Sequence, residues 1–225
     1  MDMKLKLPAL VVNFKTYPEA TGSKAIKLAK ICESAANQTR KNIWIAVQAT
    51  DIESISKAVH IPVFAQHIHS YAPGRNTGFI TAEAVKKAGA IGTLLNHSEH
   101  KIENGKLAEY IKAAKRAGLL TLVFAADLDE IDKVRKLNPD FIAIESPELI
   151  AGKVSVSNAK PRLIKDAVVL VKKHSNIPVL CGAGIQNGND ARKASELGSQ
   201  GVVVASSIVK SNNQKEAVLD IASKL

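Results

Sequence analysis

The sequence predicts an α/β fold, a single (β/α)8 barrel with eight parallel strands, and three observations support this prediction. Eight short runs of branched and apolar residues recur along the chain, and longer amphipathic stretches separate them. The runs are continuously apolar rather than alternating, which is typical of strands buried on both faces of a parallel sheet. The spacing is about 28 residues per run, close to the ~30 residues that one strand, one helix and two loops occupy.

The predicted strands are taken from these apolar runs. They are residues 9–14, 43–48, 61–66, 90–96, 119–125, 141–145, 177–182 and 201–206. Periodicity does not distinguish a closed barrel from an open doubly wound sheet, so the open sheet remains an alternative. In a barrel, function is expected where strands end and the following loops begin.

The predicted helices lie between these strands. In residues 20–36, Ala25, Leu28, Ala29 and Cys32 recur at a spacing of three and four, which indicates a helix with one apolar face. Capping residues, first-turn proline and terminal glycines mark further helices at residues 82–88, 107–117, 161–173 and 191–197. No linker-like segment divides the chain, so residues 1–225 are expected to form one catalytic domain.

Composition excludes several classes of protein. Hydrophobic residues make up 46% and charged residues 23%, which argues against disorder. No apolar run approaches the ~20 residues of a membrane helix, and no signal peptide is recognisable at the N-terminus, so a cytoplasmic location is expected. Two cysteines, Cys32 and Cys181, are too few for a disulfide framework and lack the spacing of metal ligands.

The formal net charge of +10 leaves an anionic partner open. The basic residues are spread along the chain rather than gathered in one arm, so solvated helix faces are the favoured interpretation. A basic nucleic-acid binding module is a remote alternative, which would need a contiguous basic stripe. The charge would also steer a small phosphorylated substrate.

Polar residues at five predicted strand ends are the candidates for chemistry. They are Asn13 and Lys15, His97, Glu145, Gly182-Ala183-Gly184, and Ala205-Ser206-Ser207. Glu145 is the most informative of these taken singly, because a carboxylate directly after a buried apolar run needs a partner or a cavity. The last two strand ends of such barrels usually bind phosphate through backbone N–H groups. The glycine turn and serines alone would suit another phosphate-binding barrel enzyme equally well.

The order and spacing of these residues indicate a particular family of barrel enzymes. Asn13-x-Lys15, Asn96-His97-Ser98-Glu99, Glu145 before a proline-containing loop, Gly182-x-Gly184 and Ala205-Ser206 resemble the triosephosphate isomerase family in its short archaeal form. The resemblance extends over essentially the whole chain. That family gave the TIM barrel its name and is itself the standard example of paired carboxylate and neutral imidazole catalysis, so the roles below are carried over from it.

The resemblance implies the interconversion of dihydroxyacetone phosphate and glyceraldehyde 3-phosphate, as in glycolysis and gluconeogenesis, with no metal and no organic cofactor. Glu145 is implied as the base, His97 as a neutral hydrogen-bond donor, and Lys15 as a fixed positive charge. Ser98 and Glu99 are expected to open a short helix that keeps His97 neutral, and Glu99 to pair with Lys15. The implied substrate contacts are Asn13, Phe14, Lys15, Ile150, Ala151, Gly184, Ala205 and Ser206.

Two departures from the family pattern lie in the loop after Glu145. Ser146 follows the base where relatives commonly have proline, and Ala151-Gly152-Lys153 stands where they commonly have Gly-Thr-Gly. We expect intact chemistry with altered loop kinetics or substrate affinity.

The long segment 67–78 reaches a neighbouring subunit in the family, which implies a homo-oligomer, a dimer or a tetramer. His67 and His69 in this segment, without a nearby Cys or carboxylate, are weak evidence for a metal.

Overall fold

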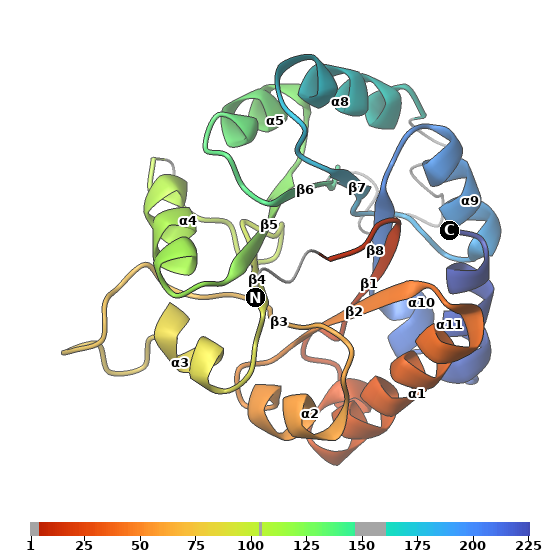
Figure 1. The fold of residues 1–225 in the computed structure, drawn as a ribbon, viewed down its shortest axis with the longest axis horizontal. Helices are drawn as coiled ribbons and strands as arrows, with labels where there is room; N and C mark the ends of the chain where they lie inside the picture. The colour runs from red at the N-terminus through yellow and green to blue at the C-terminus, as the bar shows by residue number, and fades with distance from the viewer. Residues whose placement is uncertain (1–4, 104, 147–160) are drawn as a thin grey trace.

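Eight parallel strands close into a barrel in the computed structural model, which describes residues 5–103, 105–146 and 161–225 (Figure 1). The strands follow one another in chain order, and β1 pairs with both β2 and β8. They are β1 (Ala9–Asn13), β2 (Asn42–Val47), β3 (Val63–Ala65), β4 (Gly92–Leu95), β5 (Leu120–Ala125), β6 (Phe141–Ile144), β7 (Val179–Cys181) and β8 (Gly201–Val204). The predicted barrel is confirmed, and the open sheet is excluded.

Each observed strand overlaps its predicted run, and most are shorter. The difference is three residues for each of β3, β4 and β7, which have three, four and three residues where six, seven and six were predicted. The residues trimmed from the carboxyl ends include Phe14, Asn96, Glu145 and Gly182. These residues begin the loops that follow the strands. Most of the candidate site residues therefore lie at the mouth of the barrel.

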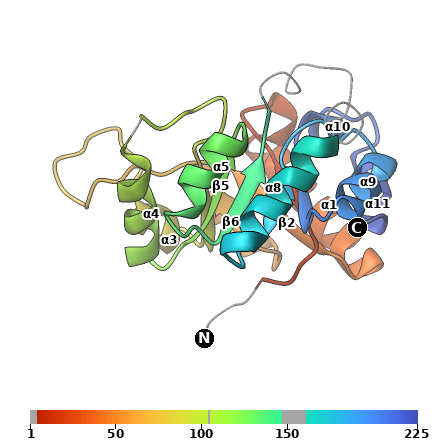
Figure 2. The ribbon, with the colours of Figure 1, turned by 90° about the horizontal axis from the view of Figure 1, so that it is seen from above.

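Helices surround the barrel (Figures 1 and 2). They are the 3-10 helix η1 (Pro18–Ala20) and α1 (Ser23–Thr39), α2 (Ile52–Ala58), α3 (Ala82–Lys87), α4 (Leu107–Arg116), α5 (Leu128–Arg135), α8 (Pro161–His174), α9 (Gly188–Glu196), α10 (Ser206–Val209) and α11 (Gln214–Ser223). The five predicted helices are present, and α2, α5, α10 and α11 were not placed from the sequence. Helix α9 begins three residues before its predicted start because the Asn187 side chain accepts hydrogen bonds from the backbone N–H groups of Asn189 and Asp190. No helix in the described ranges is long and apolar enough to cross a membrane.

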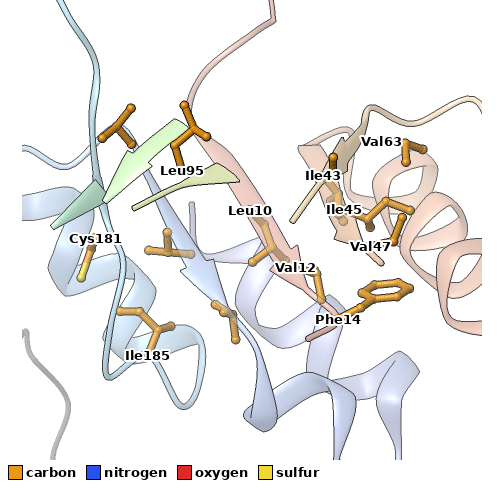
Figure 3. Close-up of a cluster of buried hydrophobic side chains, with 14 of the residues drawn as sticks. Leu10, Val12, Phe14, Ile43, Ile45, Val47, Val63, Leu95, Cys181 and Ile185 are labelled. Carbon is orange, nitrogen blue, oxygen red and sulfur yellow. The ribbon is translucent and has the colours of Figure 1, made fainter. Parts of the chain in front are cut away.

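The core has two layers, because successive side chains of a strand point to opposite faces. One layer fills the barrel interior, where Trp44 and Phe64 stack with ring centroids 5.6 Å apart. The other lies between the barrel and the helices and includes Leu10, Val12 and Phe14 (Figure 3). Strands buried on both faces explain why the apolar runs are continuous in the sequence.

The connection between β3 and α3 projects from the barrel in both views (Figures 1 and 2). It carries the exposed side chains of Tyr71 and Phe79, whose rings meet edge to face with centroids 4.8 Å apart. This is the segment that the resemblance places against a neighbouring subunit.

Candidate active site

The ends of β1, β4, β6, β7 and β8 meet around one cavity of about 130 Å³. Its lining contains the sequence-predicted residues Asn13, Lys15, His97, Glu145, Gly182, Gly184, Ala205, Ser206 and Ser207. Phe14 does not line it, because that side chain is wholly buried in the layer under the helices. Ile150 and Ala151 lie outside the described residues, as does the remainder of the departing loop sequence after Ser146.

Lys15 is held by contacts to both its backbone and its side chain. Its backbone is left-handed, with φ 47°, and its N–H donates to the Asn13 side-chain oxygen at 3.0 Å. Gln66 donates to the Lys15 carbonyl at 2.8 Å. The Lys15 Nζ atom lies 2.8 Å from Glu99 Oε1, which confirms the predicted ion pair. A conformation that is unfavourable for lysine is therefore offset by three side-chain contacts, and it aims the ammonium group into the site.

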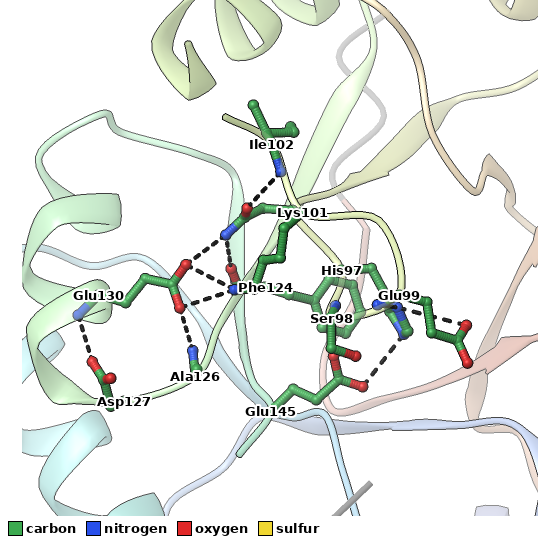
Figure 4. A network of polar contacts seen from close by, with 11 residues as sticks. His97, Ser98, Glu99, Lys101, Ile102, Phe124, Ala126, Asp127, Glu130 and Glu145 are labelled. Carbon is green, nitrogen blue, oxygen red and sulfur yellow. Dashed lines mark hydrogen bonds and ion pairs between the residues drawn. The ribbon is translucent and has the colours of Figure 1, made fainter. Parts of the chain in front are cut away.

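His97 is buried beside the ring of Phe124 and has both ring nitrogens engaged (Figure 4). The Glu99 backbone N–H donates to Nδ1 at 3.1 Å, and Nε2 lies 3.3 Å from Glu145 Oε1. Burial lowers the pKa of His97, and the positive charge of Lys15 adds to that effect while the carboxylate of Glu145 opposes it. The imidazole is thus neutral, with its proton on Nε2.

The predicted short helix at Ser98 and Glu99 is wrong. Residues 98–100 form a turn, in which the His100 N–H donates to the His97 carbonyl at 2.8 Å. The expected helix dipole is therefore missing at this point. Burial and the Glu99 N–H, rather than a dipole, keep His97 neutral.

Glu145 is buried and faces the same turn (Figure 4). Its Oε1 atom contacts His97, and its Oε2 accepts a hydrogen bond from the Ser98 backbone N–H at 3.2 Å. A carboxylate and a neutral imidazole thus meet at the mouth of the barrel. Such a pair can remove a proton from carbon and stabilise the oxygen that gains charge.

Small residues, among them Gly182, Gly184 and Ala205, also line the cavity. Gly184 has φ 70°, a conformation that glycine adopts without strain. Helix α10 starts at Ser206 and directs its first N–H groups away from the helix, where they have no acceptor within it. Backbone donors of this kind are suited to an anion such as phosphate, and they line the same cavity as Glu145 and His97.

Comparison with known proteins adds to this geometry. The family model described as triosephosphate isomerase matches residues 8–130 and 113–224. The triosephosphate isomerase of Methanobacterium bryantii is 44% identical over 219 residues, which are 97% of each chain. That of Methanothermobacter thermautotrophicus is 41% identical over 226 residues, covering 100% of this chain and 99% of the relative.

The chain belongs to the triosephosphate isomerase family. A crystal structure of triosephosphate isomerase from Bartonella henselae superposes on it with a TM-score of 0.73 and 19% sequence identity, covering 96% of both chains. This likeness independently supports the barrel fold. Family membership also agrees with the resemblance that the strand-end residues indicated.

A second cavity of about 610 Å³ adjoins the first and shares Asn13, Lys15 and His97 with it. Its wall includes His67, His69 and His100, and the rings of His67 and His100 stack with centroids 4.0 Å apart. Within the described part of the chain, no group of three or more His, Cys, Asp or Glu side chains could hold a metal ion. The cluster is therefore an aromatic and polar contact between the β3 and β4 loops.

Sequence reasoning missed Gln66, which donates to the Lys15 carbonyl, and it gave no role to Asn96, whose side chain organises the turn that carries His97. A signal was available for both residues. Each is a polar residue at the end of an apolar run, as Glu145 is, and each therefore required a partner.

Proposed function

We propose that this chain interconverts dihydroxyacetone phosphate and glyceraldehyde 3-phosphate at the cavity between Lys15, His97 and Glu145. The reaction is that of the triosephosphate isomerase family, and the assignment of residues to roles is our proposal. One observation carries it: a buried carboxylate of Glu145 lies 3.3 Å from the Nε2 atom of a neutral His97.

Glu145 removes a proton from the carbon next to the substrate carbonyl, which leaves an enediolate. The proton of the neighbouring hydroxyl group moves to the former carbonyl oxygen, and the same carboxyl group then returns its proton to the neighbouring carbon. Both protons are thereby accounted for, and no atom is gained or lost overall. His97 donates a hydrogen bond from Nε2 to the oxygen that gains charge, and the ammonium group of Lys15 stabilises that charge. Because Glu145 and His97 contact each other directly, substrate must separate them when it binds.

The phosphate group binds to backbone N–H groups of Gly184, Ala205 and Ser206, with Asn13 as a further donor near the reacting end. The resemblance adds Ile150 and Ala151, which are not among the described residues. We propose that the reaction needs no metal and no organic cofactor, since proton transfer between carbons requires only a base and a stabilised oxyanion. We also propose that residues 1–225 act as one domain.

We further propose a homo-oligomer, a dimer or a tetramer, in which the β3–α3 connection contacts a second copy. The exposed Tyr71 and Phe79 side chains on this projecting segment support an apolar contact. Analytical ultracentrifugation of the parent and of Tyr71→Ser/Phe79→Ser tests this. A parent that sediments as a monomer would contradict it.

A coupled isomerase assay tests the catalytic assignment. Glu145→Asp withdraws the carboxylate by one methylene, and His97→Gln removes the imidazole. We expect each to lower kcat by roughly 100-fold or more, because misplacement by about 1 Å can cost that much. Glu109→Asp, on the exposed face of α4, is the matched control and retains parent activity. An inactive parent would refute the reaction, and an unimpaired Glu145→Asp would refute the assigned base.

A further inference from the structure

We infer that Glu130, on α5, is a positioning residue for the turn that carries His97. This inference rests on the proposed function, because Glu130 would affect the reaction only by positioning His97. The turn, residues 96–102, supplies three groups of the site: the His97 imidazole, the Ser98 N–H that holds Glu145, and the Glu99 carboxylate that holds Lys15. A residue that holds this turn in place therefore also positions Glu145, the proposed base, and His97, the proposed hydrogen-bond donor.

The turn is closed by the side chain of Asn96, which is buried and has φ 59°. Its oxygen accepts the Ile102 N–H at 3.1 Å and so ties the two ends of the turn together. Its nitrogen donates to the Phe124 carbonyl on β5 at 2.9 Å and to Glu130 Oε1 at 2.7 Å. Asn96 is thus the link between the turn and the neighbouring β5–α5 unit.

Glu130 holds this link from outside the active site (Figure 4). Its Oε1 accepts from Asn96 and, at 2.8 Å, from the Lys101 Nζ, while Oε2 accepts from the Ala126 N–H at 2.7 Å and from Lys101 at 3.0 Å. One carboxylate therefore contacts the first residue of the turn, a residue near its end, and the loop after β5. No other acidic group bonds to both ends of this turn in the described ranges.

Glu130 itself is placed by its helix. It lies in the first turn of α5, where its backbone N–H donates to the capping side chain of Asp127 at 2.8 Å. It borders a separate cavity of about 230 Å³ with Asn96 and Ile102, and it does not line the cavity of the active site. Its influence on the reaction must therefore pass through Asn96 and Lys101.

The pairing with Lys101 also has an electrostatic consequence. The positive charge of Lys101 contributes to lowering the pKa of His97, and Glu130 is the carboxylate that neutralises this lysine. Loss of Glu130 would free the Lys101 side chain and leave the buried Asn96 amide with one partner fewer. The turn would then sample other positions, and His97 with it.

The test compares Glu130→Ala and Glu130→Gln with a control on the same helix. Asp132→Ala is the control, because Asp132 is a similarly exposed carboxylate, 33% against 29%, that pairs with Arg135 and Lys136 and makes no contact with the turn. We expect Glu130→Ala to lower kcat roughly 10- to 100-fold with KM within about threefold. Glu130→Gln retains an acceptor for Asn96 and should recover most of that loss. Asp132→Ala should leave kcat within about twofold of the parent.

A second readout does not depend on turnover. In nitrogen-detected spectra of histidine-labelled protein, the His97 ring signals should shift or broaden in Glu130→Ala and stay unchanged in Asp132→Ala. Unchanged His97 signals in Glu130→Ala, or equal losses of kcat in Glu130→Ala and Asp132→Ala, would overturn the inference. Inactivity of the parent would refute the proposed function instead, since the ring signals still report on the turn.

Discussion

The Nδ1 atom of His97 accepts a hydrogen bond from the backbone N–H of Glu99, at 3.1 Å. An acceptor nitrogen carries no proton, so this contact places the single proton of the neutral ring on Nε2, the atom that faces Glu145. The turn thus selects the tautomer as well as the position of the imidazole. If the ring were protonated on Nδ1, this N–H and the Glu99 backbone N–H would face each other as two donors, and no hydrogen bond could form.

We therefore predict that His97 is neutral and protonated on Nε2 at neutral pH. Burial lowers the pKa of this imidazole below the ordinary histidine value of 6.5, although the carboxylate of Glu145 opposes the shift, so the neutral form is favoured at neutral pH. Nitrogen-detected spectra of histidine-labelled protein measure this directly. The His97→Gln variant, which lacks the ring, identifies the His97 signals in these spectra. Ring signals of a doubly protonated His97 at pH 7 would contradict the prediction.

Lys15 and Glu99 form an ion pair in which the two side chains differ in burial. The Lys15 side chain is 16% exposed, whereas that of Glu99 is 56% exposed. Lys15→Met removes a charge that lines the cavity, and we expect kcat/KM to fall roughly 100- to 1000-fold. Glu99→Gln breaks only a partly exposed ion pair and retains the backbone N–H to His97, so a loss below about fivefold is expected.

The control for this comparison is Glu53→Gln, which breaks the exposed Glu53–Lys57 pair on α2 and should leave the kinetics unchanged. Steady-state kinetics of the three variants separates a direct role of Lys15 from general electrostatics. Equal losses for Lys15→Met and Glu99→Gln would mean that the ion pair, rather than the ammonium group, matters.

The sequence was sufficient to predict parallel strands because each strand is buried on both faces and therefore gives a continuous apolar run. The eight repeated units favoured a barrel, but the apolar runs themselves did not exclude an open sheet. The same reasoning predicted that Asn13, His97 and Glu145 lie close together, since parallel strands bring their carboxyl ends together, and all three line one cavity. The left-handed backbone of Lys15 and Asn96 was not foreseen, because neither is glycine and each depends on side-chain contacts. The bond between Asn96 and Glu130 joins residues 34 positions apart, and only the packing of α5 against β5 reveals it.

Gly201 closes the barrel where β8 meets β1. Its φ is +153°, and an added Cβ atom would lie 2.4 Å from the Ala9 carbonyl oxygen. Because backbone cannot move aside as a flexible side chain can, Gly201→Ala should lower the free energy of unfolding by about 2 to 3 kcal/mol or more. Gly74→Ala is the control, because no atom lies within 4 Å of its added Cβ, and its change should stay within about 0.5 kcal/mol. Urea unfolding of both variants makes the measurement, and similar stabilities would show that the strand junction tolerates a side chain.

The histidine cluster beside the second cavity predicts a loss of stability in acid. Burial, together with the nearby His100 and His69, lowers the pKa of His67 to about 3, and its buried Nε2 has no hydrogen-bond partner within the described residues. The ring of Tyr110 packs on the same side chain with centroids 5.7 Å apart. His67 is thus neutral in the folded chain at pH values where the unfolded chain would protonate it.

The sign of the effect follows from this difference. Between about pH 6.5 and pH 3 the unfolded state binds more protons at His67 than the folded state does, so the free energy of unfolding falls as the pH falls. His67→Gln cannot take up that proton and should lose less stability than the parent between pH 7 and pH 5. His60→Gln changes a fully exposed side chain and should follow the parent. Urea unfolding at both pH values and one protein concentration gives the comparison. If His67→Gln lost as much stability as the parent, the acid sensitivity would have to originate at other groups, since an uncharged amide at position 67 has no proton to bind.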